Sequence, residues 1–534
     1  MENALTCRRK TLQGIQGRWF VKTGLPGTRS RLWNAALAGT IRAGYDAGCA
    51  TRAERAARDE GRKVRVHFRD ANLSKPTGLN DPKTRDHPPA VGAVLARPEL
   101  VARVQEHGHQ TVVEAIRRAA AELGVRPELG RADAERWVAD RAAALLTEEP
   151  RRLHRVINGT GIVIHTNLGR APLGAEIAAR AVQVAAGYSN LELDQPKGRR
   201  GDRQDLLSTL LSQLGGAEAA MVVNNGAAAV LLALAALCRG REVVVSRGEL
   251  IEIGGGFRIP DILRLSGARL IEVGTTNRTR VQDYLAAAGP RTGAFLRVHQ
   301  SNFAMSGFVA RPSLTDLARA AREHGVLLLE DVGSGLVPPG PPAVAAEDRL
   351  AASIAAGVDL LVCSGDKLLG GSQAGIILGR TELMTRLRRH PLARALRPDK
   401  LQLAVLEETM LRYAIPGRLE EIPVWRMLHL TSDELRSRAR SWVDALSGFG
   451  LPAQLVELEG AVGGGTTPSR SLPSFGILLE DNHPARLRRR LLEVEPPVLA
   501  LERKDGVAVD ARCVLPGEDE ALLVAIRSAW GLRP

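Results

Sequence analysis

The sequence is poor in aromatic residues and in cysteine. Phe, Trp and Tyr make up only 3% of the 534 residues, so stacking of bare bases on aromatic side chains is not its main device. The five cysteines are scattered, without a CxxC pair or the spacing of zinc ligands. This excludes a disulfide framework and indicates a reducing, cytoplasmic setting. The longest uncharged apolar stretch, 219–238, is interrupted by Asn224-Asn225-Gly226, which favours a buried strand, turn and helix over a membrane span.

Lysine is also scarce, and most of the basic residues are arginine. Only 9 of the 73 basic residues are Lys, and 64 are Arg. The net charge of +14 is unevenly distributed, because residues 1–88 hold 18 basic and 8 acidic residues and therefore carry +10. The remainder of the chain is nearly balanced, so net charge alone does not identify a nucleic-acid partner.

Four segments differ in their sequence pattern. Residues 1–88 have weak periodicity, and two interpretations stay open for them: a basic, disordered extension or an over-extended gene start. Helical periodicity over 89–148 predicts a small helical domain. Apolar strands alternate with helices over 149–400, which predicts an α/β domain with a mainly parallel sheet. Residues 401–534 predict a smaller α+β domain.

Seven strands are expected in the α/β domain. They cover residues 221–223, 243–245, 270–273, 295–298, 326–330, 360–363 and 375–378. Helices are expected at 227–237 and 314–324. Ligands on such sheets bind beyond the carboxyl ends of the strands. No Walker P-loop is present, and no GxGxxG follows a strand, so a nucleotide-binding Rossmann domain is disfavoured.

Lys367 is the first candidate for chemistry. It follows the predicted strand 360–363 and stands among small residues, in the segment SGDKLLGG. A lysine at the carboxyl end of a strand can form a Schiff base with a carbonyl cofactor, and small neighbours leave room for a ring. The alternative is an exposed lysine in a turn, which is the commoner situation for a lysine taken alone.

Asp331 is the second candidate, 36 residues before Lys367 and at the end of another apolar strand. A carboxylate paired with a pyridine nitrogen keeps a pyridoxal ring protonated. A helix cap or a turn is the alternative role for an aspartate here. The succession of a strand ending in Asp and a strand ending in Lys favours pyridoxal 5'-phosphate as cofactor.

A phosphate site is predicted where strand 221–223 enters helix 227–237. Asn225, Gly226 and Ala227 form the turn, and the helix N-terminus offers free amides and a positive dipole end. Ser364 could add a hydroxyl. The alternative is an ordinary strand-to-helix turn, which is a common feature.

Two polar segments complete the set. Residues 151–172 contain Asn158-Gly-Thr-Gly, His165 and Arg170, and they are interpreted as the edge of an active site, with His165 in a structural role and not as a base. Lys197, Arg199 and Arg200 lie in a basic loop. This loop is either a solvated turn or a contact for phosphate or polynucleotide.

Together these segments resemble the bacterial selenocysteine synthase family, L-seryl-tRNA(Sec) selenium transferase. The resemblance covers roughly residues 90–534, and its motifs are long and specific as a set. The matching stretches are RVINGTGIVIHTNLGRAPL from Arg155, YSNLELD from Tyr188, RGELIEIGGGFRIPDI from Arg247, GTTNRTR from Gly274, VHQSNFAMSGF from Val298, LLLEDVGSG from Leu327, SGDKLLGGSQAGIILG from Ser364 and HPLARALRPDKLQLAVLE from His390.

The resemblance implies a pyridoxal-phosphate enzyme of the aspartate-aminotransferase fold type. Lys367 falls on the family's Schiff-base lysine, and Asp366 falls on a position needed for activity. Arg170, Arg394 and Arg397 fall on arginines that line the site of the anionic selenium donor. The helical domain at 89–148 resembles the family's tRNA-binding domain, and the family assembles into a ring, a decamer of dimers.

The resemblance also implies a reaction. L-seryl-tRNA(Sec) is converted to L-selenocysteinyl-tRNA(Sec) with selenophosphate, through an aminoacrylyl intermediate bound to pyridoxal phosphate. Two alternatives stay open. One is a related pyridoxal-phosphate lyase or transferase acting on a small amino acid or amino sugar, and the other is a non-catalytic RNA-binding protein that uses the basic N-terminus.

Overall fold

The computed structural model describes residues 89–123, 130–147, 153–253, 256–466 and 471–532. The chain separates into two compact units, Met1–Pro150 and Arg151–Pro534. The interpretations given for residues 1–88 lie outside the described residues. No helix of the described ranges is long and apolar enough to cross a membrane.

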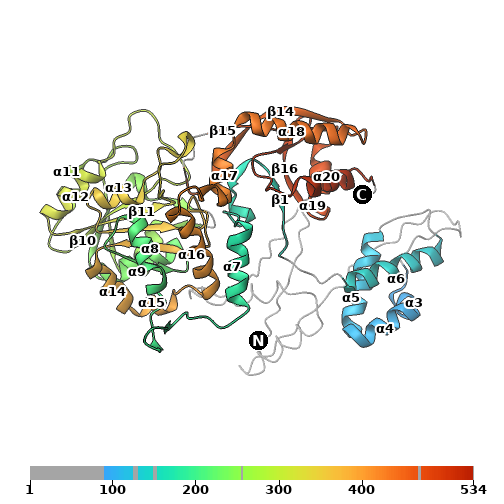
Figure 1. Ribbon diagram of the computed structural model, residues 1–534, viewed down its shortest axis with the longest axis horizontal. Coiled ribbons are helices and arrows are strands. Elements are labelled where there is room, and N and C mark those ends of the chain that lie inside the picture. Colours follow the sequence, from blue (N-terminus) through green and yellow to red (C-terminus); the bar gives the residue numbers. More distant parts are fainter. Residues whose placement is uncertain (1–88, 124–129, 148–152, 254–255, 467–470, 533–534) are drawn as a thin grey trace, which may run out of the picture. The chain divides into compact units, whose positions relative to one another are not determined.

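The first unit contains four helices in its described part: α3 (Val91–Leu95), α4 (Pro98–His107), α5 (His109–Leu123) and α6 (Arg131–Thr147) (Figure 1). Val112, Ile116 and Ala119 of α5 recur at helical spacing and are fully buried, so they form one apolar stripe. The stripe packs against residues of the other helices such as Leu100 and Val138.

A seven-stranded sheet is the centre of the second unit. Its strands are β5 (Ala219–Val223), β6 (Glu242–Ser246), β9 (Arg269–Val273), β10 (Thr292–Val298), β11 (Leu327–Gly333), β12 (Leu360–Ser364) and β13 (Gly375–Gly379). The strand order is β5-β13-β12-β11-β10-β6-β9. Only β13 runs antiparallel to its neighbours. All seven strands lie where the apolar runs of the sequence predict them.

Helices cover both faces of this sheet (Figure 1). One face packs on α9 (Gly226–Leu237), α10 (Ile259–Ser266) and α14 (Thr381–Arg389), and the other on α8 (Asp205–Gly215), α12 (Leu314–Glu323), α13 (Leu350–Ala355) and α16 (Lys400–Ala414). Strand side chains alternate between the two faces: Val223 belongs to the first core and Val222 to the second. Burial on both faces explains the continuous apolar runs of the strands.

A second, six-stranded sheet has the order β1-β16-β17-β15-β14-β2. Its strands are β1 (Ile157–Gly159), β2 (Ile162–Ile164), β14 (Ala453–Gly463), β15 (Ser471–Glu480), β16 (Val498–Arg503) and β17 (Gly506–Asp510). Helices α18 (Ser432–Ser447), α19 (Pro484–Glu493) and α20 (Asp519–Ala529) share a core with it. Strands β1 and β2 lie within the segment 149–400 but pair with strands of the segment 401–534. The domain boundaries drawn from the sequence stay predictions.

The remaining elements are short. They are α7 (Ala175–Ala185), β3 (Leu193–Asp194), β4 (Arg199–Arg200), β7 (Glu252–Ile253), β8 (Phe257–Arg258), α11 (Val281–Ala287), α15 (Pro391–Ala395) and α17 (Pro423–His429). Strands β3 and β4 form a hairpin, so the basic loop predicted at 197–203 begins in the turn and second strand of this hairpin.

Glu330, on β11, carries a testable pH dependence of stability. Burial, reinforced by the negative charge of Asp348, raises the pKa of Glu330 to about 7 from 4.5. The folded state therefore holds a proton that the unfolded chain releases above pH 4.5. The contribution of Glu330 to the free energy of unfolding, roughly 3 kcal/mol, is fully present below pH 4.5 and is lost as the pH rises through 7.

We therefore expect Glu330→Gln to leave the free energy of unfolding nearly unchanged at pH 5 and to raise it at pH 8. Urea unfolding of both proteins at the two pH values measures this. A variant that is equally destabilised at both pH values would show that Glu330 does not titrate in this range.

Candidate active site

Lys367 lies in a tight turn between β12 and β13, and only 7% of the residue is exposed. The turn is closed by backbone hydrogen bonds from the Gly370 amide to the Lys367 carbonyl and from the Gly365 amide to the Ala374 carbonyl, both 2.9 Å. Burial lowers the pKa of Lys367, although the carboxylate of Asp331 opposes this effect. A neutral amine is therefore present at a lower pH than in an exposed lysine, as a nucleophile or base requires.

Asp331 lies near the end of β11, on the strand next to the one that leads to Lys367. The register pairs Asp331 with Val362 of β12. Burial raises the pKa of Asp331, and the nearby charge of Lys367 and the Gly333 amide, 3.0 Å from Oδ1, hold it down. The structure thus brings the two predicted groups to one edge of the sheet.

The predicted phosphate site is the N-terminus of α9. The side chain of Asn225 caps the helix and accepts a hydrogen bond of 2.8 Å from the Ala228 amide. The amides of Gly226 and Ala227 have no backbone or side-chain acceptor among the described residues. A β-carbon on Gly226 would lie 2.7 Å from Oγ of Ser364. Glycine at 226 therefore allows the N-terminus of α9 to approach the Ser364 hydroxyl. The two free amides and this hydroxyl form a group of donors suited to a phosphate.

Arg170 reaches the residue beside the lysine. Its Nη1 donates to Oδ2 of Asp366 at 2.6 Å, and Asp366 is 6% exposed. The Ala171 amide also donates to the Asp366 carbonyl at 3.2 Å. Arg170 has φ +67° and is the one non-glycine residue with positive φ within the described ranges. Such a conformation costs about 1–3 kcal/mol and is concentrated at functional sites.

Arg394 and Arg397 lie elsewhere in the chain. They line a cavity of about 310 Å³ together with Arg200 of the β3–β4 hairpin, whereas Arg170 lines a different cavity beside Pro172. The single chain therefore places the three arginines implied for the selenium donor in two groups. Lys197 and Arg199 lie in the hairpin outside both cavities, where Lys197 contacts Asp194 at 3.0 Å.

His165 lies beside Arg170, with which it forms an isolated β-bridge. Burial lowers the pKa of His165. Its Nδ1 is buried without a hydrogen-bond partner among the described residues. The structural role expected for this histidine stays a prediction.

Two residues at the site were not singled out from the sequence. His299 follows β10, and its Nδ1 and the Lys367 Nζ both lie within 4 Å of the point that a β-carbon on Gly333 would occupy. Gly465 follows β14 of the second sheet, and a β-carbon there would lie 2.5 Å from Nζ of Lys367. His299 could have been identified from the sequence, because it directly follows an apolar strand and Asp331 lies near the end of another. Gly465 carries none, because 98 residues separate it from Lys367.

His299 has a buried ring nitrogen that could serve a bound ligand. Its backbone amide donates to the Asp331 carbonyl at 2.9 Å, its Nε2 lies 3.8 Å from Oε2 of Glu347, and its buried Nδ1 has no partner in the described part of the chain. Burial lowers its pKa, so the neutral imidazole can donate or accept one hydrogen bond.

We expect His299→Ala to weaken binding of pyridoxal phosphate about tenfold, since one buried hydrogen bond contributes roughly 1–3 kcal/mol. Titration of the cofactor-free protein, followed by absorbance, measures this. His324→Ala, at the exposed end of α12, is the matched control. Equal affinities of the two variants would remove His299 from the site.

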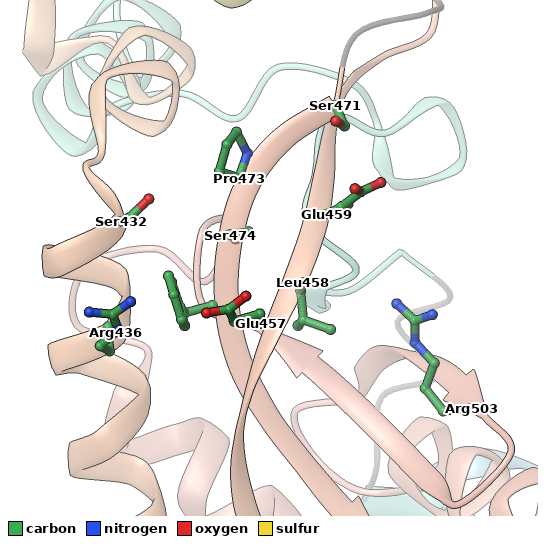
Figure 2. Close-up of a pocket in the computed structure, with 10 residues that line it drawn as sticks. Ser432, Arg436, Glu457, Leu458, Glu459, Ser471, Pro473, Ser474 and Arg503 are labelled. Carbon is green, nitrogen blue, oxygen red and sulfur yellow. The ribbon is translucent and has the colours of Figure 1, made fainter.

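A larger cavity, of about 670 Å³, lies on the second sheet. Figure 2 shows Arg436 on α18 and Arg503 on opposite sides of the β14–β15 strand pair, with Glu457 and Glu459 between them. None of the residues that line it belongs to the predicted site. Size therefore does not identify the reactive centre, whereas the chemistry around Lys367 does.

Comparisons with known proteins identify the family of the chain. The profile of the family described as L-seryl-tRNA selenium transferase matches residues 156–515, and the one described as selenocysteine synthase N terminal matches residues 89–123. The L-seryl-tRNA(Sec) selenium transferase of Geobacter sulfurreducens is 42% identical over 82% of this chain and 98% of its own length. The protein of the same name from Geotalea daltonii is 47% identical over 70% of this chain and 83% of its own length.

A solved structure supports the fold alone. D-Glucosaminate-6-phosphate ammonia-lyase superposes with a TM-score of 0.50 at 20% identity, over 71% of this chain and 96% of the other. The predicted fold class, an aspartate-aminotransferase-like α/β domain with smaller helical and α+β parts, is confirmed. By its sequence this chain belongs to the L-seryl-tRNA selenium transferase family.

Proposed function

We propose that the protein is a pyridoxal-phosphate-dependent selenotransferase. It converts L-seryl-tRNA(Sec) to L-selenocysteinyl-tRNA(Sec), with selenophosphate as the selenium donor. The observation that carries the proposal is the buried Lys367, at the carboxyl edge of the sheet in a chain of this family. Burial lowers the pKa of Lys367, which favours a reactive neutral amine and would not occur at an exposed turn lysine.

The residues of the site fit pyridoxal phosphate. The cofactor would be held by Lys367 at its aldehyde, by Asp331 at the ring nitrogen, and by the amides of Gly226 and Ala227, with Ser364, at its phosphate. The unpartnered Nδ1 of His299 could donate to or accept from a bound ring, and glycine at 465 leaves room for the Lys367 side chain that would hold it. When bound, the cofactor supplies an electron sink that stabilises negative charge at the α-carbon of the seryl group.

The side chains of this protein move the protons. Lys367, with its pKa lowered by burial, accepts the α-proton in its neutral form. Asp366 is fixed by Arg170, and this pair holds the turn that carries Lys367 in place. The hydroxyl of the seryl group then leaves as water with the proton that Lys367 accepted. The selenium of the donor would bond to the β-carbon and the proton of the donor would return to the α-carbon. Hydrolysis of the selenium–phosphorus bond would release phosphate.

The anionic substrates need cationic partners. We propose that Arg170, Arg394 and Arg397 recognise the donor, because planar guanidinium groups bind phosphate-like oxyanions by paired hydrogen bonds. Lys197, Arg199 and Arg200 of the hairpin, and the helical unit at 89–148, would contact the tRNA backbone. We further propose a homo-oligomeric ring, a decamer of dimers, and a location in the cytoplasm.

The test is product formation by the purified protein. Seryl-tRNA(Sec), selenophosphate and pyridoxal phosphate should together yield selenocysteinyl-tRNA(Sec), and omission of any one of them should stop the reaction. Release of ammonia from a small amino acid or amino sugar, without any selenium transfer, would establish the lyase alternative instead.

A further inference from the structure

Glu192 lies in the cavity lined by Arg394 and Arg397. The cavity contains five arginines, which are Arg200, Arg203, Arg388, Arg394 and Arg397, against two acidic residues, Glu192 and Asp202. Arg394 is exposed and has no ion-pair partner within the described ranges. The arginines of this cavity therefore carry more positive charge than its own carboxylates neutralise.

The carboxylate of Glu192 joins three of these arginines. Its Oε1 accepts hydrogen bonds from Arg203, with Nη2 at 2.5 Å, and from Arg397, with Nη1 at 3.2 Å. Its Oε2 accepts from Nη2 of Arg200 at 2.9 Å. Hydrogen bonds from Arg203 and the charges of the other two arginines lower the pKa of Glu192, so it is ionised. A planar oxyanion within three guanidinium groups occupies the place that a phosphoryl group would take.

The same contacts connect two parts of the proposed machinery. Arg200 belongs to the β3–β4 hairpin, and Arg203 also donates to the Pro398 carbonyl at 2.7 Å. On the other side of Arg397, the Leu396 carbonyl accepts a hydrogen bond of 2.9 Å from the Asn224 amide, one residue before Asn225. One carboxylate thus ties the hairpin to the segment of Arg397, which is tied in turn to the phosphate site.

We propose that Glu192 is an internal substitute for a phosphoryl ligand in this cavity. It holds Arg200, Arg203 and Arg397 together while the cavity is empty, and an incoming phosphoryl oxyanion displaces it. Binding at the hairpin and binding at Arg397 are then coupled, because both compete with the same carboxylate. This inference rests on the proposed function, which assigns Arg397 to the donor and Arg200 to the tRNA, and it adds how the two are linked.

Glu192→Gln tests the proposal. Glutamine keeps the shape of the side chain but not its charge, so the internal competitor is weakened while the arginines stay in place. Inorganic phosphate is the probe, and its binding to the full-length, cofactor-loaded protein is measured by calorimetry at constant ionic strength. We expect binding to be about 3- to 10-fold tighter than in the unchanged protein, as expected for loss of a partly exposed charge pair. Arg397→Ala should weaken it.

Asp194→Asn is the matched control. Asp194 lies in the same hairpin and contacts Lys197 and Arg199, but it does not line the cavity. It should change phosphate binding less than twofold. If Glu192→Gln binds phosphate as weakly as the unchanged protein, or more weakly, while its circular dichroism is unchanged, Glu192 is only a structural clamp and the proposal is wrong.

Uncharged tRNA(Sec) distinguishes the two sources of the phosphoryl group. If the tRNA backbone displaces Glu192, saturating tRNA abolishes phosphate binding; if the free donor does so, phosphate binds more tightly once tRNA occupies the hairpin. No effect of tRNA on phosphate binding would overturn the coupling. None of these measurements requires selenium transfer, so a failure of the proposed function would be seen separately, in the product assay.

Discussion

Lys367→Ala is expected to abolish selenium transfer and the visible absorbance of bound cofactor together. Lys367 is the one lysine within the described ranges that is buried, at 7% exposure, and its charge interacts with the carboxylate of Asp331, the residue proposed for the ring nitrogen. Loss of its proton transfer alone costs about 10²- to 10⁴-fold in rate, and loss of the covalent attachment adds to this. We expect no turnover above background in an assay that detects a thousandth of the normal rate.

Lys504→Ala is the control for this substitution. Lys504 is exposed, in the turn between β16 and β17, so its loss should leave both rate and spectrum unchanged. A Lys367→Ala protein that keeps its absorbance and turns over at a tenth of the normal rate would mean that another group is the reactive amine.

Gly465→Ala is expected to reduce cofactor binding at least tenfold. The added β-carbon would lie 2.5 Å from Nζ and 2.6 Å from Cε of Lys367, so the lysine would have to leave its position. Gly465 also has φ +87°, where an alanine costs about 1–2 kcal/mol. The clash with Lys367 affects the site, whereas the cost of the positive φ affects only the stability of the fold. Equilibrium titration of the cofactor-free variant with pyridoxal phosphate measures the effect on the site.

Gly417→Ala separates these two effects. Gly417 has φ +82°, but a β-carbon there would meet no atom within 4 Å. This control should lose stability in thermal unfolding and bind the cofactor normally. If Gly465→Ala and Gly417→Ala both bind the cofactor normally, the loop that follows β14 does not restrict Lys367. The short distance between Gly465 and Lys367 then has no functional consequence.

The large sheet could be predicted because its signals are local. Six of its seven strands are mostly apolar and buried, whereas the edge strand β9 also exposes charged residues, and the chain alternates the strands with helices. Lys367, Asp331 and the Asn225 turn could be found for the same reason, since each lies at or shortly after the end of such a strand. A parallel sheet then brings strand ends together without further information.

Long-range contacts could not be predicted in this way. Strands β1 and β2 pair with strands about 340 and about 300 residues later, respectively, and Gly465 approaches Lys367 from that second sheet. The basic loop at Lys197 could be predicted from its composition. Its hairpin, and the position of the Glu192 carboxylate between Arg200 and Arg397, could not. These contacts depend on how separately formed elements pack, for which neighbouring residues carry no signal.

The most direct test of the central claim is the absorbance spectrum of the cofactor-loaded protein during two titrations. Seryl-tRNA(Sec) should shift the cofactor band of the unchanged protein. The Lys367→Ala protein should show no such band. Ordinary seryl-tRNA should leave the band in place. A band that ignores both tRNAs but shifts with a small amino acid would contradict the account, because the lysine would then serve a different substrate.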